Sequence, residues 1–385
     1  MITNRLPVVS NFVFGHWFHV SPLQFKGAAY ILAWFHTIFV NVISIMFCMG
    51  CVSNMISAYS FGFKVTVFIA TGAFGMIHTL SRAIFVLTRK RKIEEILVRL
   101  LIIRQRSKII SNITRNISCL FIFYTVTYSF TIVLGFVAYE IEYKTRNVND
   151  TNENIIFLQE AVSNVNAMVE GMPNYMADVL IFITMTITSV FGIGKIISTD
   201  ILFYSWYMQI QDQYRQLTKS FAKVLINCDK GDMESATHWI QTHREINRLL
   251  ARVNSITSPC ITVSIVLSTI QICLVAYLIA KNTLITLHLA ALLIFASLGL
   301  FQMFMYCNLG QKIRDQTAKL QEAVYSMPCL GSRRDTQYAS LLICNAATER
   351  TIPLPGAPFF ALSLEFFASI LGAVFTYFIV LLQFN

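Results

Sequence analysis

Long apolar runs separated by charged segments form the main pattern of this sequence. Each run holds about 20 residues or more, which at 1.5 Å of rise per residue lets a helix cross a bilayer. The runs predict seven membrane-spanning helices, at 28–52, 65–87, 117–139, 177–198, 260–280, 287–309 and 359–385. We therefore expect an all-α membrane protein with seven transmembrane helices.

The last run, 359–385, differs from the others because its polar and very small residues recur at helical spacing. We name this set the terminal stripe: it consists of Glu365, Ser369, Gly372, Thr376, Ile379 and Gln383. These positions share one side of a helix. Lipid tolerates no unpaired polar groups, so the stripe must face protein or water. The spacing fits two interpretations, a helix-packing face and a pore wall.

Composition supports a membrane protein and argues against several other classes. The chain is 55% hydrophobic and 13% charged, and soluble proteins carry nearly twice that charged fraction. No catalytic residue set or phosphate-binding loop is present, and His238 and His243 are spaced too far apart for one helical face. We expect no enzyme activity, no cofactor, no metal site and no nucleic-acid partner.

Basic residues are distributed unevenly between the loops. Segments after the second, fourth and sixth spans carry 9, 7 and 6 Lys or Arg residues, whereas the segments after the first, third and fifth spans carry only Lys64, Lys144, Arg146 and Lys281. The positive-inside rule then predicts a cytosolic N-terminus and an extracellular C-terminus. The net charge of +10 therefore reflects membrane topology.

The loops have distinct characters. Helical periodicity predicts cytosolic helix extensions at 88–116 and 199–258, the latter with a turn at 229–232. The acidic loop between the third and fourth spans carries a glycosylation motif at Asn149. We divide the chain into a transmembrane ligand-binding unit at 1–310, cytosolic anchor helices at 311–355 and a final helix at 356–385.

Two other seven-span classes fit less well. A G-protein-coupled receptor would have the opposite orientation, and no Asn-Pro pair with a following tyrosine ends the last span. Transporters usually show internal repeats and broken helices, and neither is evident. Charged residues within the spans are few and lie near span ends: Arg82, Lys195, Asp178 and Glu365.

The C-terminal residues resemble a known signature. Thr376-Tyr377, five apolar residues and Gln383-Phe384 resemble the C-terminal motif of insect gustatory receptors. Residues 356–367 are similar to the preceding segment in that family and in the related insect odorant receptors. The motif covers about 30 residues, and the remainder of the chain matches in length, topology and basic inner loops.

The resemblance implies a ligand-gated cation channel, built as a tetramer around one central pore that the last helix lines. It also implies cytosolic anchor helices where subunits meet, and a small-molecule pocket among the outer halves of the second to sixth spans. The expected partners are a small-molecule tastant, permeating cations, further copies or related subunits, and the bilayer. The expected location is the plasma membrane of a sensory neuron.

By this resemblance, Gln383 and Phe384 form the gate, and Thr376, Ile379 and Val380 line the pore below it. Glu365 lies about 27 Å lower on a straight helix, near the inner mouth. The alternatives are a Gln383 amide among lipid headgroups and a Glu365 salt bridge to the inner helices.

Five outer-half residues combine apolar bodies with polar groups, as ligand pockets do. They are Tyr139, Asp178, Gln271, Tyr277 and His288. Each of them also fits a packing or interfacial role.

The ligand class follows from one position. The sugar-receptor branch of gustatory receptors usually has Glu after the Thr-Tyr pair, and this chain has Phe378 there. We predict a receptor for bitter or other plant compounds first and a fructose-type receptor second. The alternatives are an odorant receptor subunit that needs a co-receptor, and a seven-span transporter or scaffold without conductance.

Overall fold

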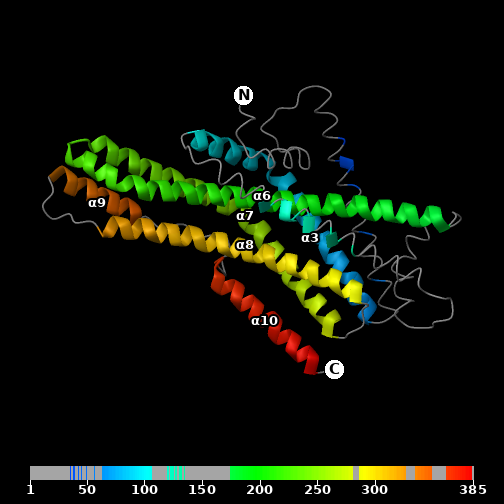
Figure 1. Cartoon of the computed structure of the whole chain (residues 1–385). Helices are drawn as coiled ribbons and strands as arrows, with labels where there is room; N and C mark the ends of the chain where they lie inside the picture. Colours follow the sequence, from blue (N-terminus) through cyan, green and yellow to red (C-terminus); the bar gives the residue numbers. More distant parts are fainter. Residues whose placement is uncertain are drawn as a thin grey trace.

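A computed structural model describes residues 63–105, 174–280, 286–326, 334–348 and 361–383, with isolated helical positions at 35–56 and 119–134. Every regular element in these ranges is a helix (Figure 1). The helices are α3 (Phe63–Gln105), α6 (Asn174–Asp229), α7 (Met233–Ala280), α8 (Thr286–Tyr325), α9 (Arg334–Thr348) and α10 (Leu364–Gln383). The all-helical prediction is confirmed for this part of the chain.

Five predicted spans lie in these helices: the second in α3, the fourth in α6, the fifth in α7, the sixth in α8 and the last in α10. The first and third spans fall largely outside the described residues. Four described helices are long and apolar enough to cross a membrane, at Ala70–Leu100, Met233–Ala280, Ala290–Tyr325 and Leu364–Gln383. Apolar length in the sequence therefore located these helices correctly.

The long helices extend well beyond a bilayer. α6 has 56 residues and is about 84 Å long, against a hydrocarbon core of about 30 Å. The predicted extension 199–258 is helical on both sides of its turn, and 88–105 continues α3. α8 continues to Tyr325 and α9 lies within the predicted anchor segment 311–355, so this segment is largely helical where the structure describes it.

The predicted turn at 229–232 separates α6 from α7. Gly231 has a φ of 93°, a left-handed conformation that a residue without a Cβ adopts readily. Asp232 caps α7, because its carboxylate accepts hydrogen bonds from the backbone N–H and the hydroxyl of Ser235. These bonds lower the pKa of Asp232 below its usual value. The turn lets α7 run back antiparallel along α6.

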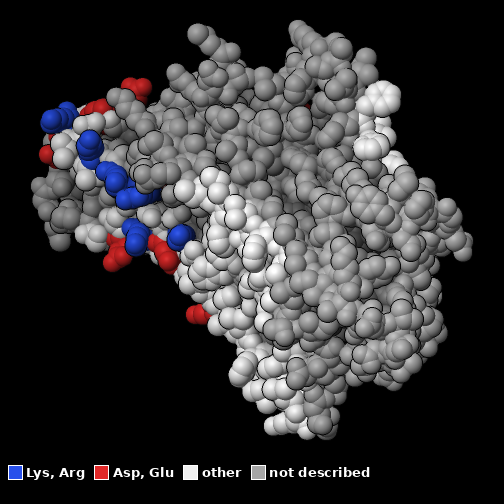
Figure 2. All heavy atoms as spheres, turned by 45° about the vertical axis from the view of Figure 1, so that its right-hand side comes forward, with Lys and Arg blue, Asp and Glu red and all other residues white. Residues whose placement is uncertain are grey.

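The core lies where α3, α6, α7 and α8 pack together, and α6 forms much of its centre. Residues 195–207 of α6 are all buried. α9 packs on α6, α7 and α8 at one end of the molecule, and α10 packs against α7 and α8 (Figure 1). Most charged side chains visible in Figure 2 gather at the end that carries α9 and the α6–α7 turn. The rest of the described surface in that view is largely uncharged.

Candidate functional site

The last helix packs on the protein with one face only. Phe366, Phe367, Ile370 and Val374 pack against the core, and the Phe367 ring meets Phe304 of α8 edge-on at 5.6 Å. α10 has no buried residue at all. One face is therefore half-covered by α7 and α8, and the rest of the helix surface is open.

The terminal stripe lies on the open face. All six of its members are exposed, and at 100° per residue they point about 180° away from the packed face. Ser369 and Thr376 donate their hydroxyl hydrogen bonds to Glu365 O and Gly372 O, each at 2.9 Å on the same helix. The stripe therefore has no packing role within its own subunit. In a membrane, its polar side must then face water or another chain.

The start of α10 is fixed on α8. Ser363 is the N-cap, because its hydroxyl accepts a hydrogen bond from the Phe366 N–H at 3.1 Å. Beside it, the Leu362 carbonyl lies so close to Gly310 of α8 that an added Cβ there would be 2.6 Å from the oxygen. Only glycine at 310 allows this approach. The start of α10 is therefore seated closely against this turn of α8.

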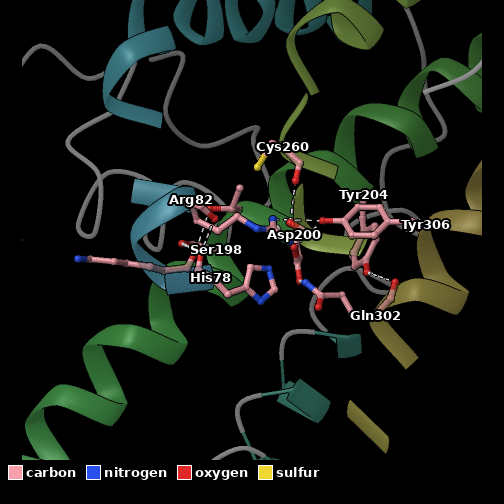
Figure 3. A network of polar contacts seen from close by, with 12 residues as sticks. His78, Arg82, Ser198, Asp200, Tyr204, Cys260, Gln302 and Tyr306 are labelled. Carbon is pink, nitrogen blue, oxygen red and sulfur yellow. Dashed lines mark hydrogen bonds and ion pairs between the residues drawn. The ribbon is translucent and has the colours of Figure 1, made fainter. Parts of the chain in front are cut away.

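A buried ion pair between α3 and α6 is hydrogen-bonded to α8 about one helical turn before Gly310. Arg82 of α3 contacts Asp200 of α6 at 2.6 Å between Nη1 and Oδ1, and the two side chains are 0% and 1% exposed. Tyr306 and Gln302 of α8 donate hydrogen bonds to the same carboxylate, at 2.5 and 2.6 Å. Figure 3 shows these four side chains converging from three helices. We call them the ionic cluster.

Aromatic side chains surround the ionic cluster. The Tyr204 hydroxyl donates to the backbone carbonyl of Gln302 at 3.4 Å and lies 3.5 Å from the hydroxyl of Tyr124. The Arg82 guanidinium lies 6.0 Å from the centre of the Phe203 ring. Figure 3 shows Cys260 of α7 at the edge of the group. The cluster thus joins α3, α6 and α8 at one level of the bundle.

The cluster and the α10 start are close along α8. Tyr306 precedes Gly310 by four residues, or about 6 Å of helix. A buried charge pair of this kind is costly to break, and the hydrogen bonds from Tyr306 and Gln302 tie α8 to it. The cluster therefore fixes α8 relative to α3 and α6, at the part of α8 against which α10 begins.

Sequence reasoning identified Arg82 as a charge near a span end but missed its partner. Asp200 lies two residues beyond the predicted fourth span and was not singled out. A usable signal was present, because a basic residue in an apolar run requires an acidic partner at matching depth. Asp200, just beyond the end of its predicted span, meets that requirement.

Of the five predicted ligand residues, the structure describes the side chains of Gln271 and Tyr277. Gln271 is buried, and its amide donates to Thr71 O at 3.4 Å, so it joins α7 to α3. Tyr277 is half-buried on α7. Asp178 and His288 lie in α6 and α8, but their side chains are outside the described set. Tyr139, Asn149 and Phe384 are outside the described residues.

Comparisons with known proteins agree with this architecture. The family model described as 7tm Odorant receptor matches residues 65–375. The fold is similar to the insect olfactory receptor OR5 from Machilis hrabei, solved in complex with eugenol, with a TM-score of 0.78. That match has 17% sequence identity and covers 100% of this chain and 98% of the other. A second structure of the same receptor gives a TM-score of 0.77 at 18% identity over 98% of this chain and 97% of the other.

The sequence relatives match only part of the chain. Odorant receptor coreceptors from Anopheles gambiae and Drosophila melanogaster are each 28% identical over 146 residues. The matched segment spans 38% of this chain and 30% of each coreceptor. The predicted membership of the insect chemoreceptor superfamily is confirmed, whereas the gustatory branch is not shown. Because the family model covers most of its length, this chain belongs to the 7tm odorant receptor family.

Proposed function

We propose that this chain is a chemosensory receptor subunit of the odorant type and forms a ligand-gated cation channel lined by α10. The family supports the receptor role. The channel role is supported by the terminal stripe, which is exposed on the face of α10 opposite the packed one. A fourfold ring of such helices places the stripes around a central wet path, as pore walls require.

The pore runs along the stripe in this proposal. Glu365 attracts cations at the inner mouth, Thr376 and Ile379 line the middle with Val380 beside them, and Gln383 with Phe384 forms the outer gate. Rings of apolar side chains close a narrow pore by dewetting, and a rotation that turns amides inward opens it. Gln383 is exposed at the end of α10, as this role requires.

In this proposal, α8 transmits the effect of ligand binding to the pore. A small molecule among the outer halves of the helices, near Tyr139, Asp178, Tyr277 and His288, displaces α7 and α8 slightly. α10 rests on both of these helices. The close contact between Gly310 and Leu362 carries an α8 displacement to the base of α10. Gln271 contributes to helix packing in this scheme, since its amide is already paired.

The partner of the subunit follows from its relatives. The matched relatives are odorant receptor coreceptors. We propose that this chain assembles with a coreceptor subunit in the plasma membrane. A second candidate, a tastant receptor that works as a homotetramer, is favoured by the motif from Thr376 to Phe384. Bitter plant compounds and then fructose-type sugars are the ligands of that candidate.

Electrical recording separates the two candidates. The chain is expressed alone and with an insect coreceptor, and current is recorded during application of volatile aromatics, alkaloids and sugars. Evoked cation current only in the paired expression supports the odorant-type subunit. Evoked current from the chain alone supports the homomeric tastant receptor. Surface-expressed protein without current in either arm contradicts the channel proposal.

The gate has its own test. Gln383→Ala or Phe384→Ala changes resting or evoked current, whereas Leu382→Ala, an exposed residue off the stripe, leaves both unchanged. Equal currents in all three variants would remove the gate assignment. Asn112, in the predicted cytosolic extension 88–116, also lies in a glycosylation motif. A glycan on Asn149 supports the proposed orientation, and one on Asn112 instead would invert it.

A further inference from the structure

The exposed face of α3 changes from apolar to basic within one turn. Ile77, Ile84 and Leu87 are exposed hydrophobic residues along this helix. The next exposed positions on the same face are Thr88 and then the pair Arg91 and Lys92. Exposed apolar residues suit acyl chains, and basic residues suit the headgroup layer. The edge of the hydrocarbon region on α3 therefore lies near Thr88.

The adjacent helix α7 changes at the same level. Val266 and Val263 are exposed apolar residues, and the next exposed positions toward the start of α7 are Pro259, Ser255 and Arg252. The Arg89 guanidinium of α3 donates a hydrogen bond to the Ser255 carbonyl at 3.0 Å. The two helices thus meet at this level and together present an apolar wall that ends in basic side chains.

The basic residues at this edge outnumber the acidic ones. We call them the boundary cluster: Arg89, Lys90, Arg91, Lys92, Arg99 and Arg252, with Glu94 and Glu95 as the acidic neighbours. Glu95 is shared by Arg99 at 3.1 Å and Arg252 at 3.2 Å. Arg89 is held by Ser255 and by the ring of Phe85.

Arg91 and Lys92 lie on the exposed surface of the boundary cluster. Both are exposed, and neither has an ion-pair partner among the residues that the structure describes. They follow the apolar wall directly. An anion bound here would therefore sit at the rim of a surface that also accepts hydrocarbon.

We propose that the boundary cluster binds the headgroup of an anionic phospholipid, with its acyl chains along the exposed faces of α3 and α7. Clusters of Lys and Arg next to a membrane-spanning helix bind such headgroups through charge. The apolar wall selects a lipid over a soluble anion, because it offers nothing to a headgroup without chains. The lipid lies in the cytoplasmic leaflet, which rests on the proposed orientation; the binding itself does not.

Lipid binding is tested on the purified full chain in neutral detergent. Thermal melting and native mass spectrometry are followed during titration with phosphatidylserine and, separately, with phosphatidylcholine. Phosphatidylserine raises the melting temperature and gives lipid adducts at lower concentration than phosphatidylcholine does. Each basic residue contributes about fivefold to affinity, so R91Q/K92Q weakens phosphatidylserine binding roughly 25-fold.

Matched variants make the result specific. K219Q/K223Q removes two exposed charges from α6 far along the helix and leaves the phosphatidylserine affinity unchanged. R91K/K92R retains binding within about threefold, since charge is conserved. Glycerophosphoserine, the headgroup without chains, gives no shift in melting temperature.

Three results would overturn the proposal. They are equal weakening by both glutamine pairs, which assigns the effect to net charge; equal binding of the two phospholipids; and undiminished phosphatidylserine binding in R91Q/K92Q. The lipid-free melting temperature of each variant shows that it is folded. No current is measured, so failure of the channel proposal leaves this test intact.

Discussion

The ionic cluster and α10 are opposite in how they meet their surroundings. Arg82 and Asp200 are fully enclosed by helices of one chain, and each finds its counter-charge there. α10 has no buried residue, although it is one of the most apolar segments of the described structure. The charges of the first region are paired within one chain, whereas the open face of the second is not covered by that chain.

This difference shows where one subunit ends as a physical unit. Buried charges in a membrane protein must be paired, so the cluster fixes α3, α6 and α8 without outside help. An exposed polar stripe in a membrane needs water or another chain. The contact between Gly310 and Leu362 joins the helices fixed by the ionic cluster to α10.

Removing one member of the ion pair should have the largest effect on the stability of the protein. Asp200→Ala leaves Arg82 buried without its counter-ion, and we expect a loss of about 3–5 kcal/mol in stability. Thermal melting of the purified protein measures this loss. The double variant Arg82→Met with Asp200→Leu should lose less than Asp200→Ala, because no charge remains unpaired. A single variant that melts within a degree of the parent would contradict the cluster's role.

Gly310→Ala acts at the junction of the two regions. The new Cβ would lie 2.6 Å from Leu362 O and 2.9 Å from Leu362 Cβ, so α10 must shift at a cost of about 1–3 kcal/mol. Spin labels on α8 and α10 should report the displacement as a changed distance.

Gly299→Ala on the same helix provides the control. The nearest atom to its Cβ is Ile272 Cδ1 at 3.9 Å, an ordinary contact. Alanine favours a helix over glycine by up to about 1 kcal/mol, so this variant should be neutral or slightly stabilised. If Gly310→Ala behaves the same way, α10 is not held by that contact.

The two regions also differ in how far the sequence predicted them. The terminal stripe was visible in advance because one helix carries the whole pattern, and its spacing needs no tertiary information. The structure placed it on the exposed face of α10. In the proposed channel, whether water lies along it depends on neighbouring copies, which no spacing within one chain encodes.

The ionic cluster was not visible in the same way. Its four residues come from three helices, and Gln302 and Tyr306 look like ordinary span residues in the sequence. Their convergence depends on the register of α3, α6 and α8 against each other. Hydrophobic length predicts helices but not register to within one turn. Gly310 was missed for the same reason, since its partner is 52 residues away at Leu362.

Ser363→Ala sharpens the comparison at the first turn of α10. Losing the N-cap should cost about 1 kcal/mol and leave the Phe366 N–H without its partner. Amide hydrogen exchange at Phe366 and Phe367 should become faster, while exchange in α6 stays unchanged. Ser369→Ala, two turns along on the exposed face, should leave both rates as they are. Equal acceleration by the two variants would show that the cap is not what holds this turn.

The smallest effect on stability, and the most specific one on function, comes from exchanging methyl and hydroxyl groups on the two faces of α10. Thr376→Val removes a hydroxyl from the open face, where surface changes stay within about 0.5 kcal/mol. If α10 lines a water-filled pore, the same change makes the pore wall less polar. The current should then fall while the melting temperature is unchanged. Val374→Thr, on the packed face, is the matched control: melting should drop by about 1 kcal/mol, because the new hydroxyl is partly buried, and single-channel conductance should hold. If Val374→Thr lowers conductance and Thr376→Val does not, the pore lies on the other side of the helix.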